Sequence, residues 1–467
     1  MLKILINYLV LAFIIISGNS SFAQTYSPED AWCDAQISLR AEKSAVAQKR
    51  IEWWRNARFG MFIHWNPSSV VVSEISWSKQ FYPGNGEILL ENPRPDAGFS
   101  GGKEHTAWLD WFKPAVPNEV YDNLYKSFYP GMFDADRFVA QAKDAGMKYI
   151  VMVAKHHDGF CMWDSKFTEF DVMSTPFKRD ILGEMAAAAH KAGLKFGIYY
   201  SQRDWHQPDY KPGTIAKYNE YMRNQLKELL TKYGEISALF FDSGEWKTWK
   251  LWEGDQLFKL IYKLQPNIVI NDRCGVPADY TTPEQSIGNF NNQRDWESCM
   301  TFTGFWSWHG FQTPVISFED CLKYLISCAA GDGNLLMNIG PMPTGQIDPR
   351  EASRLKQVGE WLKKNGESIY GTRGGPFLPD SNKVSTHREN QVFVHVFNSK
   401  NVTIELPGLP QKIEKAEILA GSGIGFNQTS TSISFFLPVG LAENVVTTVK
   451  LTLDKNVDEK QISIQKK

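Results

Sequence analysis

Short apolar runs alternate with amphipathic stretches along most of the chain. The runs cover residues 59–64, 148–153, 194–200, 237–241, 267–271 and 334–339. They are continuously apolar rather than alternating, as strands buried on both faces require. The helical stretches between and after them cover residues 135–145, 181–192, 218–233, 257–264, 318–330 and 355–364, and glycines follow several of these. This order predicts right-handed crossovers and a (β/α) barrel of the TIM type, and the barrel is expected to be irregular because the helix after the sixth strand is hard to place.

The pattern changes after Gly374. Residues 391–397, 402–406, 432–436 and 446–453 alternate between apolar and polar with period two, and Gly, Pro and Asn turns separate them. Such alternation predicts an antiparallel β-sandwich. We therefore expect a catalytic barrel domain over residues 24–370 and a C-terminal sandwich domain over residues 371–467. A Gly- and Pro-rich stretch over residues 81–112 is long for a structureless connection, so we expect a functional loop over the barrel mouth.

The first 23 residues have the pattern of a secretory signal. Lys3 gives a positive start, residues 4–16 are apolar, and Ser21-Phe22-Ala23 ends the segment with small residues. The apolar run is short for a membrane span. We expect cleavage after Ala23 and a secreted or periplasmic protein without stable membrane insertion; the alternative is an uncleaved anchor.

The composition argues against some classes of protein function and favours others. Lys+Arg is 50 and Asp+Glu is 52, so the formal net charge of −2 argues against a nucleic-acid-binding protein. The chain has 16 Trp and 17 Tyr, a high number that favours a cleft whose aromatic rings stack on sugars. Six scattered cysteines form neither a disulfide scaffold nor a zinc pattern, and we expect most of them to be buried free thiols.

Polar and aromatic residues follow the predicted strands, at the rim where a barrel carries its active site. They are His64-Trp65, Lys155-His156-His157-Asp158, Tyr199-Tyr200, Asp242 and Asn271-Asp272-Arg273. Asp242 follows an apolar strand directly, so its carboxylate needs donors, and Arg273 is a candidate partner. The alternative for Asp242 is a helix N-cap.

His156 and His157 allow three interpretations. They could bind a metal, form a buried pair bonded to backbone carbonyls, or bind the hydroxyls of a sugar. Neighbouring histidines on a strand point to opposite faces and no H-E-x-x-H pattern is present, so a metal is the least favoured. The nearby Trp65 and Trp163 favour the sugar.

Glycoside hydrolysis needs a second carboxyl group opposite the first. Glu284 and Glu297 are the candidates. Glu297 lies between Trp296 and the apolar stretch 299–308, and apolar neighbours raise the pKa of a carboxyl group, as a general acid requires.

Several blocks together resemble the α-L-fucosidases of glycoside hydrolase family 29. They are RFGMFIHW at 58–65, YIVMVAKHHDGF at 149–160, WDSK at 163–166, KRD at 178–180, FGIYYS at 196–201, FD at 241–242, NDR at 271–273, WE at 296–297 and GNLLMNIGP at 333–341. The resemblance implies a retaining exo-glycosidase with a sandwich after its barrel, acting on a fucosylated oligosaccharide or glycoconjugate, with neither cofactor nor metal. It does not indicate the oligomeric state.

The same resemblance implies roles for particular residues. Asp242 matches the nucleophile, and Glu297 is the first choice for the acid/base, with Glu284 as the alternative. The expected sugar-binding residues are His64, Glu74, Trp77, His156, His157, Tyr200, Arg273 and Trp308, the last as the wall against the fucose methyl group.

The sequence departs from the family pattern in the unusual 81–112 loop and in two shorter segments. Asn66-Pro67 follows the first strand, and Ser307-Trp-His-Gly310 stands near the predicted methyl wall. His309 could bind a hydroxyl on C6, so an α-L-galactosidase is the alternative activity, because an apolar wall discriminates weakly against an added hydroxyl. A non-catalytic fucose-binding protein and a zinc hydrolase are the alternatives from other classes.

Overall fold

The computed structural model describes residues 45–79, 116–211, 213–242, 251–275, 278–397, 403–438 and 445–458. The predicted signal peptide, the 81–112 loop and Cys33 lie outside the described residues. The other cysteines, Cys161, Cys274, Cys299, Cys321 and Cys328, are free and buried, as expected.

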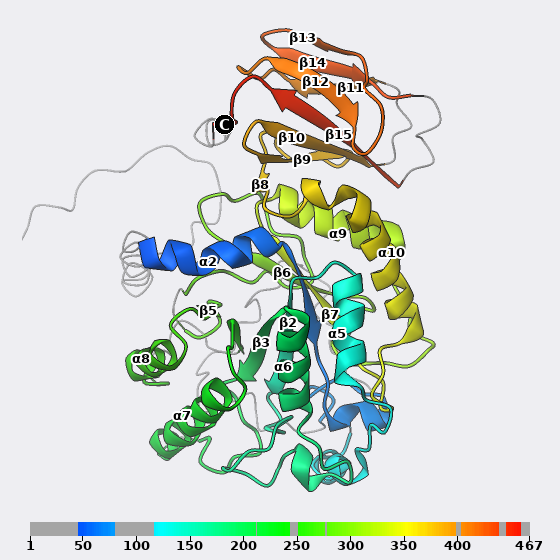
Figure 1. Ribbon diagram of the computed structural model, residues 1–467. Coiled ribbons are helices and arrows are strands. Elements are labelled where there is room, and N and C mark those ends of the chain that lie inside the picture. Colours follow the sequence, from blue (N-terminus) through cyan, green and yellow to red (C-terminus); the bar gives the residue numbers. More distant parts are fainter. Residues whose placement is uncertain are drawn as a thin grey trace, which may run out of the picture. The chain divides into compact units, whose positions relative to one another are not determined.

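Seven parallel strands form a curled sheet in the order β5-β4-β3-β2-β1-β7-β6 (Figure 1). Their bounds are β1 Phe59–Ile63, β2 Tyr149–Lys155, β3 Lys195–Ser201, β4 Ala238–Asp242, β5 Val269–Ile270, β6 Glu297–Thr301 and β7 Asn334–Ile339. Parallel neighbours need crossover connections, and these are the helices that surround the sheet in Figure 1. The predicted barrel is therefore confirmed.

Each of the six amphipathic stretches corresponds to a helix, although the last helix begins six residues earlier than expected and the helix over residues 45–57 was not predicted. Their bounds are α2 Ala45–Ala57, α5 Ala135–Asp144, α6 Ile181–Ala192, α7 Ile215–Lys232, α8 Gly254–Leu264, α9 Phe318–Ala330 and α10 Pro349–Asn365, with a single turn α4 at Asn118–Tyr121. Short 3-10 turns lie at Pro67–Val71, Leu124–Ser127, Val172–Ser174 and Gly366–Ser368. Aspartates cap α5 and α6: the side chains of Asp134 and Asp180 accept from backbone N–H groups of the first turn.

The irregularity of the barrel lies between β5 and β6. Among the described residues, no regular strand lies in this gap. Residues 279–285 occupy it through isolated parallel bridges that pair Asn271 with Tyr280, Thr281 with Trp296, and Glu284 with Cys299. Backbone bonds such as Glu297 N–H to the carbonyl of Thr281 (2.9 Å) accompany them. This segment connects the two edge strands, and it places Glu284 on the barrel wall.

Side chains of the strands alternate between two buried cores. One core fills the barrel and includes Phe62, Val151, Tyr199 and Phe240. The other lies between the strands and the helices and includes Ile150. Because both faces are buried, the strands read as continuous apolar runs, and only the alternation decides which side chains face the barrel axis.

Two antiparallel sheets follow, which confirms the predicted C-terminal β-structure. One has the order β12-β15-β10-β9-β8 and the other β11-β14-β13. The strand bounds are β8 Arg373–Gly374, β9 Lys383–Arg388, β10 Gln391–Phe397, β11 Thr403–Pro407, β12 Ile413–Ile418, β13 Phe426–Gln428, β14 Ser432–Phe436 and β15 Val446–Leu453. The two sheets share one apolar core that includes Val394, Phe435 and Leu451. The domain boundary at residue 370 stays a prediction.

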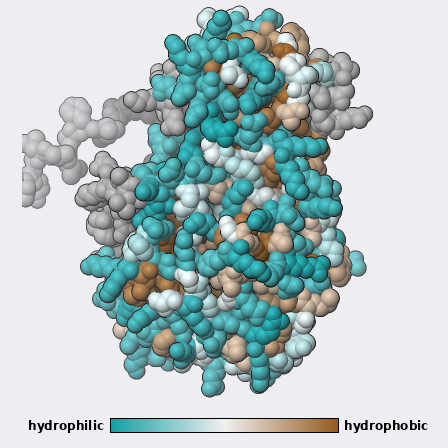
Figure 2. Space-filling view, viewed as in Figure 1, coloured by the Kyte–Doolittle hydropathy of each residue, from teal (hydrophilic) through white to brown (hydrophobic). Residues whose placement is uncertain are grey.

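Hydrophilic residues cover most of the face shown in Figure 2, and hydrophobic residues gather there only in small separate patches. Within the described residues, none of the helices combines the length and the hydropathy needed to cross a membrane.

Candidate active site

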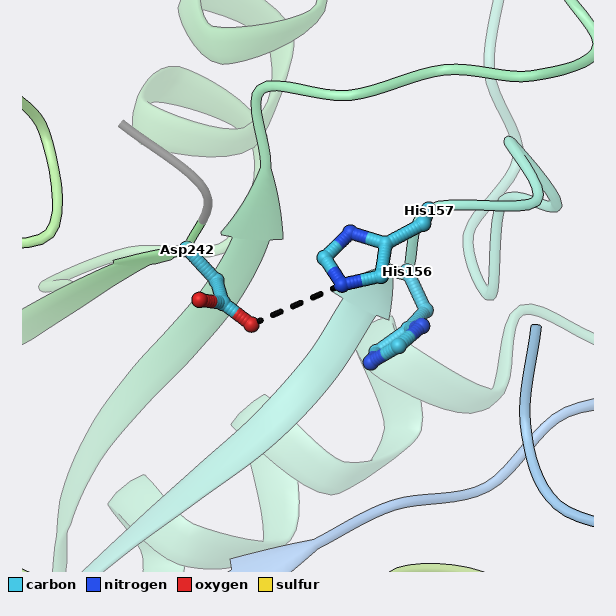
Figure 3. Close-up of side chains that lie close together, drawn as sticks. All are labelled: His156, His157 and Asp242. Atoms are coloured by element: carbon cyan, nitrogen blue, oxygen red, sulfur yellow. Dashed lines mark ion pairs between the residues drawn. The ribbon is translucent and has the colours of Figure 1, made fainter. Parts of the chain in front are cut away.

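Asp242 is the last residue of β4, and side chains from both neighbouring strand ends bind its carboxylate. Tyr199 of β3 donates its hydroxyl to Oδ2 at 2.7 Å. Arg273, which follows β5, places Nη1 3.3 Å from Oδ1. His157, which follows β2, has Nε2 3.7 Å from Oδ2 (Figure 3). The carboxylate therefore lies at the C-terminal end of the sheet among donors.

These donors keep Asp242 ionised. Burial alone would raise the pKa of its carboxyl group, but Arg273, His157 and the Tyr199 hydroxyl outweigh burial and lower the pKa to about 2. An ionised carboxylate at this position is suited to nucleophilic attack.

Glu284 lies beside Asp242 on the connecting segment 279–285. Its Oε2 is 2.8 Å from Nη2 of Arg273, the guanidinium that also contacts Asp242. Burial raises the pKa of Glu284 and the negative charge of Asp242 adds to this, although Arg273 and a hydrogen bond from Trp306 oppose both. Two carboxyl groups thus share one guanidinium while their pKa values are shifted in opposite directions.

Arg273 is itself fixed in place. Nε donates to Oγ1 of Thr282 at 2.8 Å, and Nη2 donates to the Thr282 carbonyl at 3.0 Å. Because Thr282 belongs to the same segment as Glu284, the guanidinium holds the irregular part of the barrel against β4 and β5.

Glu297, our first choice for the acid/base, lies at the opposite end of the barrel. It is the first residue of β6 and pairs with Asn334, the first residue of β7. Its Oε2 accepts from Nε1 of Trp54 at 3.1 Å and from the hydroxyl of Tyr149. Tyr149 begins β2, and this strand rises about 20 Å before it reaches the catalytic end at Lys155. The expectation that Glu297 faces Asp242 is therefore wrong, and Glu284 takes its place as the candidate.

Three buried histidines surround the site, and each has its Nδ1 bound at 2.6 Å by a small polar side chain. His64 contacts Asn338, His156 contacts Ser76, and His157 contacts Ser201. Burial lowers their pKa values, to about 4 for His64, to about 3 for His157 and well below the usual value for His156. The three rings are thus neutral at physiological pH.

For His64 the network also indicates the tautomer. Asn338 donates its Nδ2 to the Trp306 carbonyl at 2.8 Å, so its Oδ1 accepts from Nδ1–H of His64. Nε2 of His64 is then left as an acceptor for a ligand hydroxyl.

His156 and His157 lie on the same side, contrary to our expectation. Strand β2 ends at Lys155 with a shift of register after Val153, so the two histidines are beyond the regular strand. Their ring centroids are 4.1 Å apart.

His156, His157 and Asp242 have possible ligand atoms within 4.8 Å of one another (Figure 3). Arg273 beside Asp242 would repel a cation held there, and Tyr199 already bonds Oδ2 of that carboxylate. The electrostatics of the trio therefore favour a polar ligand over a metal ion.

Tyr200 does not face the site. Its hydroxyl donates to Oε1 of Gln225 at 2.7 Å, and its ring belongs to the core between sheet and helices. Tyr199, one position earlier, faces the barrel axis and binds Asp242. The expectation for Tyr200 is therefore wrong by one residue, which in a strand is the difference between two faces.

Of the two tryptophans expected at the site, the structure places Trp77 there and Trp308 elsewhere. Trp77 lies beside His157, with ring centroids 5.1 Å apart. Trp308 instead donates Nε1 to Asp348 at 2.9 Å and packs on Phe311. Trp306, rather than Trp308, lies beside His64, with ring centroids 4.7 Å apart, and hydrogen-bonds Glu284.

The carboxylate of Glu74 binds the backbone of the loop that contains Trp306 instead of being exposed to a ligand. Its carboxylate accepts the backbone N–H groups of Trp306 (3.2 Å) and Ser307 (3.1 Å), and Nε2 of His309 lies 3.2 Å away. Its contribution to the site is therefore to position the tryptophan.

Known proteins are similar to this chain in sequence and in fold. The family model described as Alpha-L-fucosidase matches residues 22–367. The chain belongs to the α-L-fucosidase family of glycoside hydrolases. It is 28% identical over 370 residues to the plasma alpha-L-fucosidase of Homo sapiens, covering 73% of this chain and 74% of that protein. It is 28% identical over 399 residues to the alpha-L-fucosidase of Branchiostoma floridae, covering 76% and 81%.

Solved structures of the family agree with the fold. Alpha-L-fucosidase isoenzyme 1 from Paenibacillus thiaminolyticus has a TM-score of 0.76 at 30% identity, covering 88% of this chain and 100% of that chain. A GH29 alpha-L-fucosidase from Bacteroides thetaiotaomicron has a TM-score of 0.73 at 25% identity, covering 87% and 96%. The architecture of this α-L-fucosidase family member is thus that of its relatives.

The strand ends indicated the pair Tyr199-Tyr200 but not which of the two faces the site, and they did not reveal Trp306 or the three residues that bind the histidines. The parity of β3 could have indicated Tyr199, because Ser201 pairs with Asp242 and residues two apart share a face. Asn338, Ser76 and Ser201 come from three separate segments, and no local pattern relates them.

The buried Glu297 predicts a dependence of stability on pH. Burial raises its pKa to about 7, although Tyr149 and Trp54 donate to it. A carboxyl group whose pKa is raised by folding contributes stability fully below its unfolded pKa and loses that contribution as pH rises through about 7. Between pH 5 and pH 8 the wild type should lose about 2–3 kcal/mol of unfolding free energy relative to Glu297→Gln, measured by urea unfolding.

Glu360→Gln is the matched control, because the Glu360 side chain is 59% exposed. It should follow the wild type at both pH values. If Glu297→Gln also follows the wild type, Glu297 does not hold a proton in the folded state.

Proposed function

We propose that the protein is a retaining exo-α-L-fucosidase, with Asp242 as the nucleophile and Glu284 as the acid/base. The observation that carries the proposal is the contact of Arg273 with both carboxyl groups, at 3.3 Å from Asp242 and 2.8 Å from Glu284. Asp242 is held ionised, and the pKa of Glu284 is raised. Carboxyl groups of opposite protonation on either side of one bond are what a retaining glycosidase requires.

The reaction then proceeds in two displacements. Asp242 attacks C1 of the fucosyl group while Glu284 gives its proton to the glycosidic oxygen, so the C–O bond breaks and the alcohol leaves. The fucosyl group is then an ester on Asp242. Glu284, now ionised, takes a proton from water, which attacks C1 and releases the carboxylate of Asp242. Two inversions at C1 return the original configuration.

The surrounding groups are suited to a single sugar ring. Nε2 of His64 is an acceptor for a hydroxyl, and the neutral rings of His156 and His157 provide further partners near Asp242. Trp77 and Trp306 present aromatic faces beside two of these histidines. Flat apolar faces and neutral hydrogen-bonding groups together match a deoxyhexose.

The relatives support the same activity. The human and Branchiostoma floridae proteins are alpha-L-fucosidases by name. The Bacteroides thetaiotaomicron structure is a covalent intermediate trapped with 2-fluoro-fucosyl fluoride in a glutamate-to-glutamine variant. By analogy, we expect the substrate here to be a terminal α-L-fucosyl group on an oligosaccharide or glycoconjugate.

We also propose that the protein is exported to the periplasm or secreted. The support is the sequence alone, namely Lys3, the apolar residues 4–16 and the small residues before Gln24.

Removal of the nucleophile should abolish turnover. Asp242→Ala is expected to lower kcat on an aryl α-L-fucoside by about 10⁴-fold or more, because no ester can form. Added azide fits the space left by the carboxylate and should restore part of the rate, giving the β-fucosyl azide by a single inversion. The product is identified by NMR, and circular dichroism checks the fold. Near-wild-type activity would contradict the assignment.

The two glutamates should differ in their dependence on the leaving group. Glu284→Ala is expected to lose about 10²–10⁴-fold in kcat/KM on an alkyl fucoside, whose oxygen needs a proton to leave, and much less on a dinitrophenyl fucoside. Glu297→Ala serves as the matched control, and any loss it causes should be equal for both substrates. A loss confined to the alkyl fucoside in Glu297→Ala would reverse the assignment.

A further inference from the structure

Lys155 and Asp204 form a buried ion pair directly behind the histidines. Nζ of Lys155 lies 2.8 Å from Oδ2 of Asp204, and the side chains are 0% and 1% exposed. Lys155 ends β2 and immediately precedes His156. Its ammonium also lies 4.5 Å from the centroid of the Tyr200 ring and donates to the Tyr218 hydroxyl at 3.1 Å. The pair therefore faces the helices, away from the substrate side.

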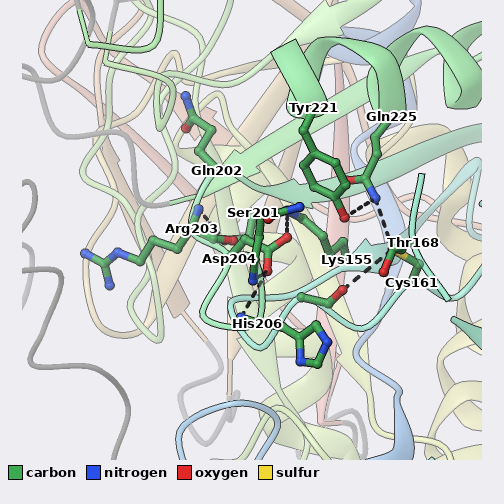
Figure 4. Close-up of polar contacts among 12 residues, drawn as sticks. Lys155, Cys161, Thr168, Ser201, Gln202, Arg203, Asp204, His206, Tyr221 and Gln225 are labelled. Carbon is green, nitrogen blue, oxygen red and sulfur yellow. Dashed lines mark hydrogen bonds and ion pairs between the residues drawn. The ribbon is translucent and has the colours of Figure 1, made fainter. Parts of the chain in front are cut away.

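Asp204 anchors the loop that follows β3. Its second oxygen, Oδ1, accepts the backbone N–H groups of His206 (3.1 Å) and Gln207 (2.9 Å), as Figure 4 shows for His206. Gly159, at φ +87°, packs against the same oxygen, because a Cβ there would lie 2.2 Å from it. The loop after β3 is thus packed tightly on the loop after β2.

The last residue of β3 and the anchored loop after it each hold His157 at one point. Ser201 Oγ is 2.6 Å from Nδ1 of the ring, and the backbone N–H of Trp205 donates to the His157 carbonyl at 2.8 Å. The Trp205 ring packs on the imidazole with centroids 5.6 Å apart. Since Nε2 of His157 is 3.7 Å from Asp242, the position of this loop determines how the histidine meets the nucleophile.

Stability alone does not account for such a pair. Two charges removed from water lose hydration that their attraction offsets only partly, so a neutral pair of similar shape is often as stable. Removal of one partner is different, because it leaves the other charge buried and unpaired.

We propose that the Lys155–Asp204 ion pair is a positioning device for His157. By fixing the loop 202–207 against the end of β2, it sets the imidazole beside Asp242, and its loss lowers turnover more than it lowers stability. The inference rests on the proposed function, because His157 is placed next to the proposed nucleophile.

The test separates turnover from stability with three variants. Lys155→Met and Asp204→Asn each leave one buried partner, so both should lower Tm. The double variant leaves neither charge, so its Tm should return most of the way to that of the wild type. Its kcat on an aryl α-L-fucoside should nevertheless stay at least about tenfold below the wild type, with a smaller change in KM.

Arg58 and Asp332 provide a matched control pair at the N-terminal end of the barrel. They form an ion pair of 2.5 Å with side chains 1% and 15% exposed. Arg58→Met with Asp332→Asn should change Tm while kcat stays within about twofold of the wild type.

Two results would overturn the positioning role: wild-type kcat in the Lys155→Met/Asp204→Asn protein, or an equal loss of kcat in the control pair. A wild type that is inactive on every α-L-fucoside tested would instead refute the proposed function, and the positioning role with it.

Discussion

The site depends on one guanidinium that lies between two carboxyl groups. Arg273 contacts Asp242 and Glu284 with different nitrogens, and Thr282 holds the guanidinium from the third side. Without this cation, two buried carboxyl groups would compete for a proton, and the ionised state of Asp242 would be costly. With it, the pKa of Asp242 falls to about 2 while that of Glu284 stays raised. The division of labour between nucleophile and proton donor follows from that difference.

The three histidines of the site are neutral, and their positions come from the fold. Each histidine is fixed through Nδ1 by a small side chain on another segment, which leaves the opposite edge of the ring for a ligand. Glu74 binds the backbone of the Trp306 loop, and Asp204 binds the loop that grips His157. Carboxylates that the reaction does not use thus accept backbone N–H groups in the loops that shape the pocket.

Hydrophobic patterning predicted the barrel, its strand ends and the sandwich, because burial on two faces or on one leaves different periods in the sequence. Asp242, Arg273 and the histidines were predicted for the same reason, since they directly follow strands. The residues that were predicted wrongly lie where the hydrophobic pattern does not indicate which way a side chain points. Tyr199 and Tyr200 differ only in parity, and Trp306 and Trp308 only in loop geometry. Glu284 lies on a segment without strand periodicity, whereas Glu297 has apolar neighbours because it is in the barrel core.

The stereochemistry of the released sugar tests the central claim most directly. Proton NMR recorded during the first minutes of hydrolysis of an aryl α-L-fucoside shows which anomer of fucose forms before mutarotation mixes the two. A covalent ester on Asp242, opened by water with help from Glu284, predicts that the α-anomer appears first. Initial release of the β-anomer would mean a single displacement by water and would contradict the account.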